Sequence, residues 1–484
     1  MQVQRRKPRT ARVGVFGVGH HTYWDQFAGL RDELLGYLDL FEEMVWANDV
    51  EVVNVGLVDD AESAQAALKR LKAADLDLVF CDMLTYATSS TFGLIVRELA
   101  VPIVLVALQP LAAMDYQRAT TRMQLANDNI CSLPEFSGVA VRLGKRPPPS
   151  IIGTLHDDAE ARGEIAEWCD VAKVLHDLRG ARIGQMGHVL EAMLDMHSDP
   201  TAFTAHFGLH VVQTEPDEIL RQYRTVTDPE IAAKSQEILG FFDTPDPRSD
   251  PVTRKLTADD LRTAARVAVA LDKFVAARKL DGLAYYYEAE EGSEMRQVVS
   301  NLIVGNSLLT AAGFPMCGEC DLKTCVAMLI LDRLDIGGSF AEFHPVDFAE
   351  GFVLVGHDGP HHISIAQGRP ALRSLIKYHG KPGSGASVEF KIEEGPISML
   401  GITQTHDGRF KFVIAEGESV AGPIPATGNT NTRGFFQPDV KTFLKRWIAE
   451  GPTHHFALGL GHHAGTIQKI ADALGIDSVI VTRE

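Results

Sequence analysis

The chain has 484 residues, of which 45% are hydrophobic and 23% are charged, and its formal net charge is −18 at pH 7. This length allows about two to four domains with separate cores, and the composition is that of an ordinary globular protein. The negative charge argues against nucleic acid or an anionic membrane surface as a partner, because both attract a positive surface. The sequence has no apolar run long enough to span a bilayer and no secretory signal at its start, so we expect a cytoplasmic protein.

The first third of the chain alternates between apolar runs and helix-like stretches. This alternation predicts a doubly wound α/β domain over residues 1–178. The first apolar run ends in glycines followed by His20, His21 and bulkier aromatic residues, which leave no room for a pyrophosphate. We therefore expect a small polar ligand at this edge of the sheet, where Gln109 also lies. Four apolar runs read as its buried strands: residues 11–19, 50–58, 76–83 and 101–108.

A second doubly wound α/β domain is predicted over residues 179–336. Its strands are expected at 181–187, 208–214 and 281–292, and Thr257 is expected to cap a long helix. After Gly337 the sequence changes to short apolar runs separated by turn residues, with 362–367 among them, which is typical of a barrel or sandwich. Residues 337–484 are thus predicted to form a C-terminal, mainly β, barrel-like domain.

Several acidic and imidazole side chains lie at expected element boundaries, where a polar group can enter a cleft. Glu319 precedes a helix-like run, Glu342 follows a pair of glycines, and His357 ends an apolar strand. A second apolar strand runs into Gly461, His462 and His463. Two carboxylates and two imidazoles from separate loops suit a divalent metal ion. Taken alone, a glutamate or histidine at a strand end is far more often a solvated loop residue than a ligand.

The six cysteines are too few for a disulfide framework in a chain of this length. Cys317, Cys320 and Cys325 cluster, which raises a zinc or a redox interpretation. A structural zinc requires a fourth ligand, and the other cysteines are distant in sequence. We expect reduced thiols that contribute to packing.

These motifs resemble the L-arabinose isomerases and their L-fucose isomerase relatives, which are metal-dependent aldose–ketose isomerases. The Gly-Glu-x-Asp signature of that family is similar to residues 318–321, the next acidic motif falls on Glu342, and the Gly-His at a strand end falls on His357. The C-terminal Gly-x-His-His of the family is similar to residues 460–463. The resemblance implies two α/β domains followed by a β domain.

The resemblance also implies roles for particular residues. Glu319, Glu342, His357 and His463 would hold the metal, and the two glutamates would also act as acid and base. Mn²⁺ is the expected ion, with Co²⁺ or Mg²⁺ as substitutes. The partner would be a small-molecule sugar, and the active unit a homo-oligomer, a tetramer or a hexamer. The residues expected to contact the sugar are His20, Gln109, Tyr287 and His462.

The implied reaction is the interconversion of an aldose and a ketose, for a free pentose or (deoxy)hexose such as L-arabinose, through a metal-stabilised enediol. A hydride shift would use the same residues. Three positions depart from the arabinose members near the expected pocket: the residues around His20, Leu322 in place of an aromatic residue, and the polar run after His357. These departures place L-arabinose itself in question. Two other functions stay open, a sugar-binding regulator without catalysis and a metal-dependent sugar epimerase.

Overall fold

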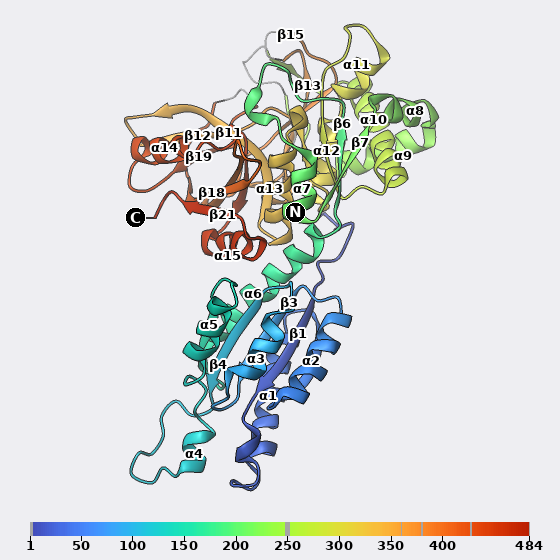
Figure 1. Ribbon diagram of the computed structural model, residues 1–484. Helices are drawn as coiled ribbons and strands as arrows, with labels where there is room; N and C mark the ends of the chain where they lie inside the picture. Colours follow the sequence, from blue (N-terminus) through green and yellow to red (C-terminus); the bar gives the residue numbers. More distant parts are fainter. Residues whose placement is uncertain (1–2, 247–251, 360, 379–380, 426–427, 484) are drawn as a thin grey trace. The chain divides into compact units, whose positions relative to one another are not determined.

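The computed structural model describes residues 3–246, 252–359, 361–378, 381–425 and 428–483. They form two compact units, Arg9–Asp177 and the combination of Met1–Pro8 with Leu178–Glu484 (Figure 1). Boundaries at 178 and 336 remain predictions, because this division places the central and C-terminal regions in one unit. None of the described helices is both long and apolar enough to cross a membrane.

The unit Arg9–Asp177 is built on a parallel sheet with the strand order β2-β1-β3-β4-β5. The order changes direction between β1 and β3, which is the arrangement of a doubly wound fold. Its strands are β1 (Arg12–Val18), β2 (Glu51–Val58), β3 (Leu78–Met83), β4 (Ile103–Gln109) and β5 (Ser150–Thr154). Its helices are α1 (Leu30–Trp46), α2 (Ala61–Ala73), α3 (Ser89–Val96), α4 (Thr121–Leu125), α5 (Leu133–Arg142) and α6 (Ala159–Leu178).

The second unit begins with another parallel sheet, in the order β10-β9-β6-β7. Its strands are β6 (Arg182–Met186), β7 (His210–Thr214), β9 (Gly282–Tyr285) and β10 (Met316–Cys317). The helices of this region are α7 (Pro200–Phe207), α8 (Pro216–Thr225), α9 (Asp228–Phe241), α10 (Ala258–Arg278), α11 (Glu294–Val299), α12 (Ile303–Ala311) and α13 (Leu322–Arg333).

The same unit continues into a closed, antiparallel barrel in the order β17-β20-β11-β12-β19-β18, because β17 also pairs with β18. The predicted fold class is therefore confirmed: parallel α/β sheets followed by a β-barrel. The barrel strands are β11 (Gly337–Asp347), β12 (Phe352–Gly356), β17 (Gly395–Gln404), β18 (Phe410–Val420), β19 (Thr432–Phe435) and β20 (Phe456–Leu460). Outside the barrel ladder lie β21 (Asp477–Ile480), which pairs in parallel with β18, and the helices α14 (Val440–Ala449) and α15 (Ala464–Leu474).

Smaller elements complete the unit. The strands β16 (Ala386–Glu389), β13 (Ala371–Leu375) and β8 (Thr253–Arg254) form one sheet, and β14 (Lys377–Tyr378) pairs with β15 (Lys381–Pro382). Residues 362–367 were predicted as a strand, and this prediction is wrong: Ile363–Ile365 form a 3₁₀ turn. The His362 ring is bonded on both sides, to Asp332 at 3.3 Å and to Ser364 at 2.6 Å, so the chain turns around this side chain.

Helix α13 is the central element of the second unit. It packs against β11, β17 and β20 of the barrel and against β9 of the parallel sheet, and every one of its residues is buried. Asp321 begins the helix by accepting hydrogen bonds from the backbone N–H groups of Lys323 and Thr324. The turn before Asp321 is thereby fixed between the parallel sheet and the barrel.

Candidate metal centre and substrate pocket

Glu319 lies on the tight turn Gly318–Cys320, between β10 and α13. Its backbone is left-handed, with φ 57° and ψ 14°, a conformation that a residue with a side chain adopts rarely. The side chain is only 13% exposed, and burial raises the pKa of its carboxyl group. The turn therefore presents a carboxylate that has lost much of its contact with water.

Three barrel strands bring further ligand-type side chains to one place through their register. Ala341 of β11 pairs with Phe456 of β20, so Glu342 lies next to His455, the residue before β20. Glu342 in turn pairs with Gly356 at the end of β12, and His357 follows directly. Glu342 was expected at an element boundary, but it lies inside β11, just before a bulge between Phe343 and Val346. One row across the barrel thus carries Glu342, His357 and His455.

The four side chains converge on one another. Glu319 Oε1 lies 3.9 Å from His357 Nε2, and Glu319 Oε2 lies 3.9 Å from His455 Nε2. One ligand atom each from Glu342, His357 and His455 lie within 4.8 Å of one another, and so do those of Glu319, His454 and His455. Ligand atoms of an octahedral ion lie about 3 to 4 Å apart, since each is about 2.1 Å from the ion. The separations therefore fit a divalent ion better than direct hydrogen bonds.

The two buried histidines use Nδ1 for hydrogen bonds, which leaves Nε2 of each ring available as a metal ligand. His357 Nδ1 donates to the carbonyl of Asp358 at 2.8 Å, and His455 Nδ1 donates to Asp321 Oδ2 at 3.3 Å. Each Nε2 then carries a lone pair directed toward Glu319, which is how outer partners fix metal-binding imidazoles. Burial lowers the pKa of His357 well below its usual range, so this ring is neutral at pH 7.

Two buried polar atoms at this place lack a hydrogen-bond partner among the described residues, Glu319 Oε2 and His455 Nε2. A buried carboxylate oxygen or imidazole nitrogen without a hydrogen-bond partner costs folding free energy unless a further group binds it. A divalent cation would satisfy both. The residues present thus fit a metal ion of the kind that takes oxygen and imidazole ligands.

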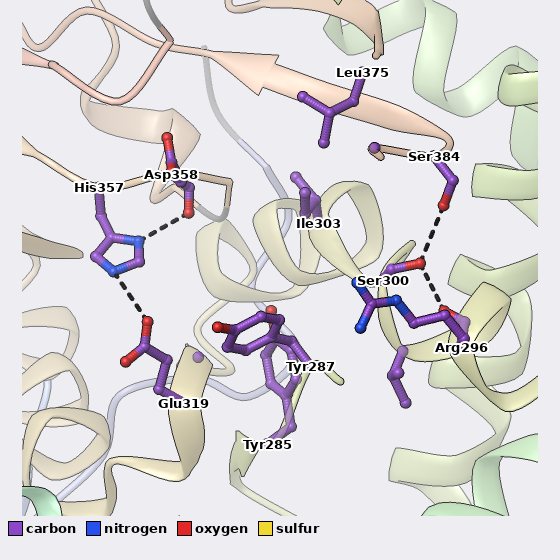
Figure 2. A pocket seen from close by; sticks show the side chains of 13 residues that line it. Tyr285, Tyr287, Arg296, Ser300, Ile303, Glu319, His357, Asp358, Leu375 and Ser384 are labelled. Carbon is purple, nitrogen blue, oxygen red and sulfur yellow. Dashed lines mark hydrogen bonds and ion pairs between the residues drawn. The ribbon is translucent and has the colours of Figure 1, made fainter. Parts of the chain in front are cut away.

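A pocket opens beside this group, and Glu319 and His357 form part of its wall. Figure 2 shows these two residues at one side, Tyr285 and Tyr287 in the middle, and Arg296 at the other side. Burial raises the pKa of Tyr287 to about 12, with Glu319 adding to the rise. Its hydroxyl therefore stays protonated at neutral pH. The remaining lining residues are Val299, Ser300, Ile303, Gly318, Asp358, Leu375, Gly383 and Ser384.

The structure brings together three of the predicted metal ligands, Glu319, Glu342 and His357, and it places the predicted sugar contact Tyr287 in the pocket. His463 belongs to neither group of ligand atoms, because it follows the far end of β20. The predicted sugar contact His462 also follows that end, half-exposed, with Nε2 donating to the carbonyl of Gly417 at 3.1 Å.

The other two predicted sugar contacts belong to the unit Arg9–Asp177. His20 follows β1, and its ring lies 5.2 Å from that of Tyr23 and 6.2 Å from that of Tyr86. Gln109 ends β4 and donates a hydrogen bond to the carbonyl of Leu111. Both lie at the carboxyl edge of the parallel sheet, as expected from the sequence, and their role toward the sugar stays a prediction.

Sequence reasoning missed His454, His455 and the two carboxylates that bond them. Asp195 Oδ2 accepts from His454 Nδ1 at 2.6 Å, and Asp321 bonds His455 as described. The sequence did carry a signal for His454 and His455. They come directly before the apolar strand that His462 follows, so they also lie at a strand boundary. The cysteines next to the turn are buried free thiols, and Cys320 Sγ donates to the carbonyls of Met186 and Ala284.

Comparison with known proteins defines the class. The family described as L-fucose isomerase, C-terminal domain, matches residues 371–481. An L-arabinose isomerase from Nocardioides sp. is 24% identical over 441 residues, which cover 89% of this chain and 86% of that protein. An L-arabinose isomerase 1 from Bacillus licheniformis is 22% identical over 72% of this chain and 69% of its own length. An L-arabinose isomerase from Bacillus subtilis is 21% identical over 69% of this chain and 67% of its own length.

The chain is thus similar to L-arabinose isomerases over most of its length, and to the C-terminal domain of L-fucose isomerases over residues 371–481.

Proposed function

We propose that this chain is a metal-dependent aldose–ketose isomerase for a pentose or hexose skeleton, with Glu319, Glu342, His357 and His455 as the metal ligands. The observation that carries this proposal is the convergence of these side chains beside a pocket that Glu319 and His357 line. Ligand atoms of Glu342, His357 and His455 lie within 4.8 Å of one another, and Glu319 lies 3.9 Å from both His357 and His455. The isomerase activity of the relatives supports it. A divalent ion bound there supplies Lewis-acid stabilisation of negative charge on the oxygens at C1 and C2.

Two carboxylates provide the proton transfers. In the aldose-to-ketose direction one glutamate takes the proton from C2 and returns it to C1, while the hydroxyl proton at O2 moves to O1 with the help of the other. Burial raises the pKa of Glu319, which makes its carboxylate a better proton acceptor than an exposed one. General acid–base help of this kind contributes about a hundredfold to ten-thousandfold in rate.

The rest of the pocket orients the sugar. Tyr287 keeps its hydroxyl proton and can donate a hydrogen bond to a sugar oxygen. Glu319, His357 and Tyr287 line the same cavity, so the reacting carbons and the bonded oxygen would lie in one small volume. Holding the substrate in this way removes the entropy cost of bringing separate groups together.

The test is a panel of aldoses incubated with the metal-stripped protein and with Mn²⁺, Co²⁺ or Mg²⁺ added back, in D₂O. We expect ketose formation only with a divalent ion, and deuterium at C2 of the aldose or C1 of the ketose. Ketose without label would favour a hydride shift, since hydride does not exchange with water. A single epimer without ketose would favour an epimerase. Binding without any product, across pentoses, hexoses and 6-deoxyhexoses, would favour a sugar-binding regulator and refute the isomerase.

Two further expectations remain, the first implied by the family resemblance and the second by the sequence. The active unit would be a homo-oligomer, a tetramer or hexamer, and the protein would be cytoplasmic. Light scattering of the active protein at micromolar concentration tests the first, and cell fractionation tests the second.

A further inference from the structure

The pocket has two chemically different ends (Figure 2). At one end Glu319 and His357 present the carboxylate and imidazole described above. At the other end lie Arg296, Ser300 and Ser384, from α11, the segment after it and the loop before β16. A substrate that is held by its carbonyl end near Glu319 therefore extends its opposite end toward these donors.

Arg296 retains most of its hydrogen-bonding capacity. Its side chain is 23% exposed, and its ion pair among the described residues joins Nη1 to Glu288 Oε1 at 3.8 Å. That separation is beyond hydrogen-bond range, so the pair reduces the charge without occupying the donors. Figure 2 shows the side chain extending from α11 into the pocket, toward Tyr287. A guanidinium offers five N–H donors in a planar fork and no acceptor.

Ser384 also presents a donor to the pocket, next to Ser300. Ser300 Oγ donates to the backbone carbonyl of Arg296 at 2.6 Å, so its proton is already used. Ser384 Oγ accepts from Asn301 Nδ2 at 3.3 Å and lies 3.1 Å from Ser300 Oγ. The hydroxyl of Ser384 is thus left with a proton to give, either to Ser300 or to a ligand.

We propose that Arg296 and Ser384 bind an anionic group, a carboxylate or a phosphate monoester, at the end of the substrate remote from its carbonyl. The match is one of chemistry: an anion accepts several hydrogen bonds at once, and a guanidinium binds carboxylate and phosphate oxygens in pairs. A neutral sugar terminus would leave most of the Arg296 donors without a partner of opposite charge. The substrate class is then an acidic or terminally phosphorylated sugar rather than the neutral sugars implied by the resemblance.

This inference rests on the proposed function for its substrate, but binding can test it without turnover. The probes are xylitol, xylonate and xylitol 5-phosphate, which have no aldehyde or ketone group and cannot be isomerised. Calorimetry with the full chain, with and without Mn²⁺, measures each dissociation constant at low and high salt. We expect at least one anionic probe to bind tenfold or more tightly than xylitol, and this advantage to shrink as salt screens the charge.

The variants separate Arg296 from general charge effects. Arg296→Gln should bring the anionic probe to the affinity of xylitol and change xylitol binding less than twofold, while Arg296→Lys should keep part of the advantage. Glu288→Gln removes the competing carboxylate and should tighten anion binding severalfold, which provides a test even if the Arg296 variants fold poorly. The matched control is Arg262→Gln. Arg262 lies on α10 and forms an exposed ion pair with Asp228, so this variant loses the same charge away from the pocket.

The binding results test the anion site separately from the isomerase activity. The inference is overturned if xylitol and both anions bind with equal affinity. It is also overturned if Arg296→Gln weakens the binding of all three probes equally, and both results hold whether or not the protein is an isomerase. Arg296-dependent anion binding in a protein that converts no sugar retains the anion site and refutes the isomerase. The carboxylate and phosphate arms decide which anion the site takes.

Discussion

Strand β20 has a His-His pair at each end, and the two pairs differ completely in their surroundings. His455, before the strand, is fully buried, bonded to Asp321 and 3.9 Å from Glu319. His462, after the strand, has a side chain that is 49% exposed and lies 3.1 Å from Glu418. Identical dipeptides beside the same apolar strand thus have different chemistry, because only one end of the strand meets the other ligand-bearing elements.

Strand geometry explains why only one pair can belong to the metal centre. A strand rises about 3.3 Å per residue, so the first and last of the five residues of β20 are about 13 Å apart. The ligand atoms of Glu342, His357 and His455 lie within 4.8 Å of one another, as do those of Glu319, His454 and His455. A metal ion can therefore use one end of β20 only, and the pairing of Ala341 with Phe456 selects the end that carries His455.

The largest expected effect comes from removing the carboxylates that face the buried pair. Glu319→Gln or Glu342→Gln should lower kcat at saturating Mn²⁺ by about a thousandfold or more, since each removes both a ligand charge and a proton-transfer group. The matched control is Glu418→Gln, which faces the exposed pair and should keep near-wild-type turnover. Comparable losses in Glu418→Gln and Glu319→Gln would contradict the assignment of the centre.

The histidines themselves give the next largest effect. His455→Ala should weaken Mn²⁺ binding by about a hundredfold or more and lower activity in parallel, because a ligand is lost and the Asp321 carboxylate loses its partner. His463→Ala should change Mn²⁺ affinity less than threefold. Metal titration by calorimetry measures both, and the reverse ranking would restore the ligand assignment made from the sequence.

A smaller effect is expected when the partner of His455 is altered. Asp321→Asn should weaken Mn²⁺ binding about tenfold to a hundredfold, the range typical of outer-shell partners. Asp321 also caps α13, so the control is Asp439→Asn at the equivalent cap of α14. The control should lose a similar amount of helix-cap stability in thermal unfolding while its metal affinity is unchanged.

The smallest effect belongs to the exposed pair. His462→Gln should alter turnover less than twofold and the free energy of unfolding by less than about 1 kcal/mol, since an exposed ion pair contributes little. Steady-state kinetics and urea unfolding measure these quantities. A tenfold fall in kcat/KM would show that His462 contacts the sugar after all, as the sequence suggested.

The sequence carried enough information for the fold class and for part of the site. The period and the length of the apolar runs predicted most of the strands. The prediction that His357 follows the end of a strand is confirmed, since β12 ends at Gly356. Glu342 was expected after a break, because Gly337 and Gly338 interrupt the pattern. Both glycines have positive φ and begin β11, where a side chain on Gly338 would come within 2.6 Å of the Met328 carbonyl. They mark a close approach to α13 rather than the end of an element.

The choice between the two His-His pairs could not be made from the sequence. It depends on which barrel strands pair and in which register, and that is decided by long-range contacts between β11, β12 and β20. Asp321 likewise entered the sequence analysis only as the last residue of the 318–321 motif, since its bond to His455 joins residues 134 positions apart. Local patterns identify candidate ligands, and only the pairing of distant strands selects among them.

The turn that carries Glu319 also constrains how this protein could evolve. Glu319 and Cys320 both have left-handed backbones, with φ 57° and 62°, which costs about 1 to 2 kcal/mol for each residue with a side chain. Glycine at either position would relieve this strain, yet at 319 it would delete the carboxylate. Stability and activity therefore compete directly at position 319, whereas Cys320→Gly could gain backbone stability at the loss of its buried thiol contacts. Selection for greater heat resistance alone would favour glycine at both positions and would give a more robust protein without its carboxylate.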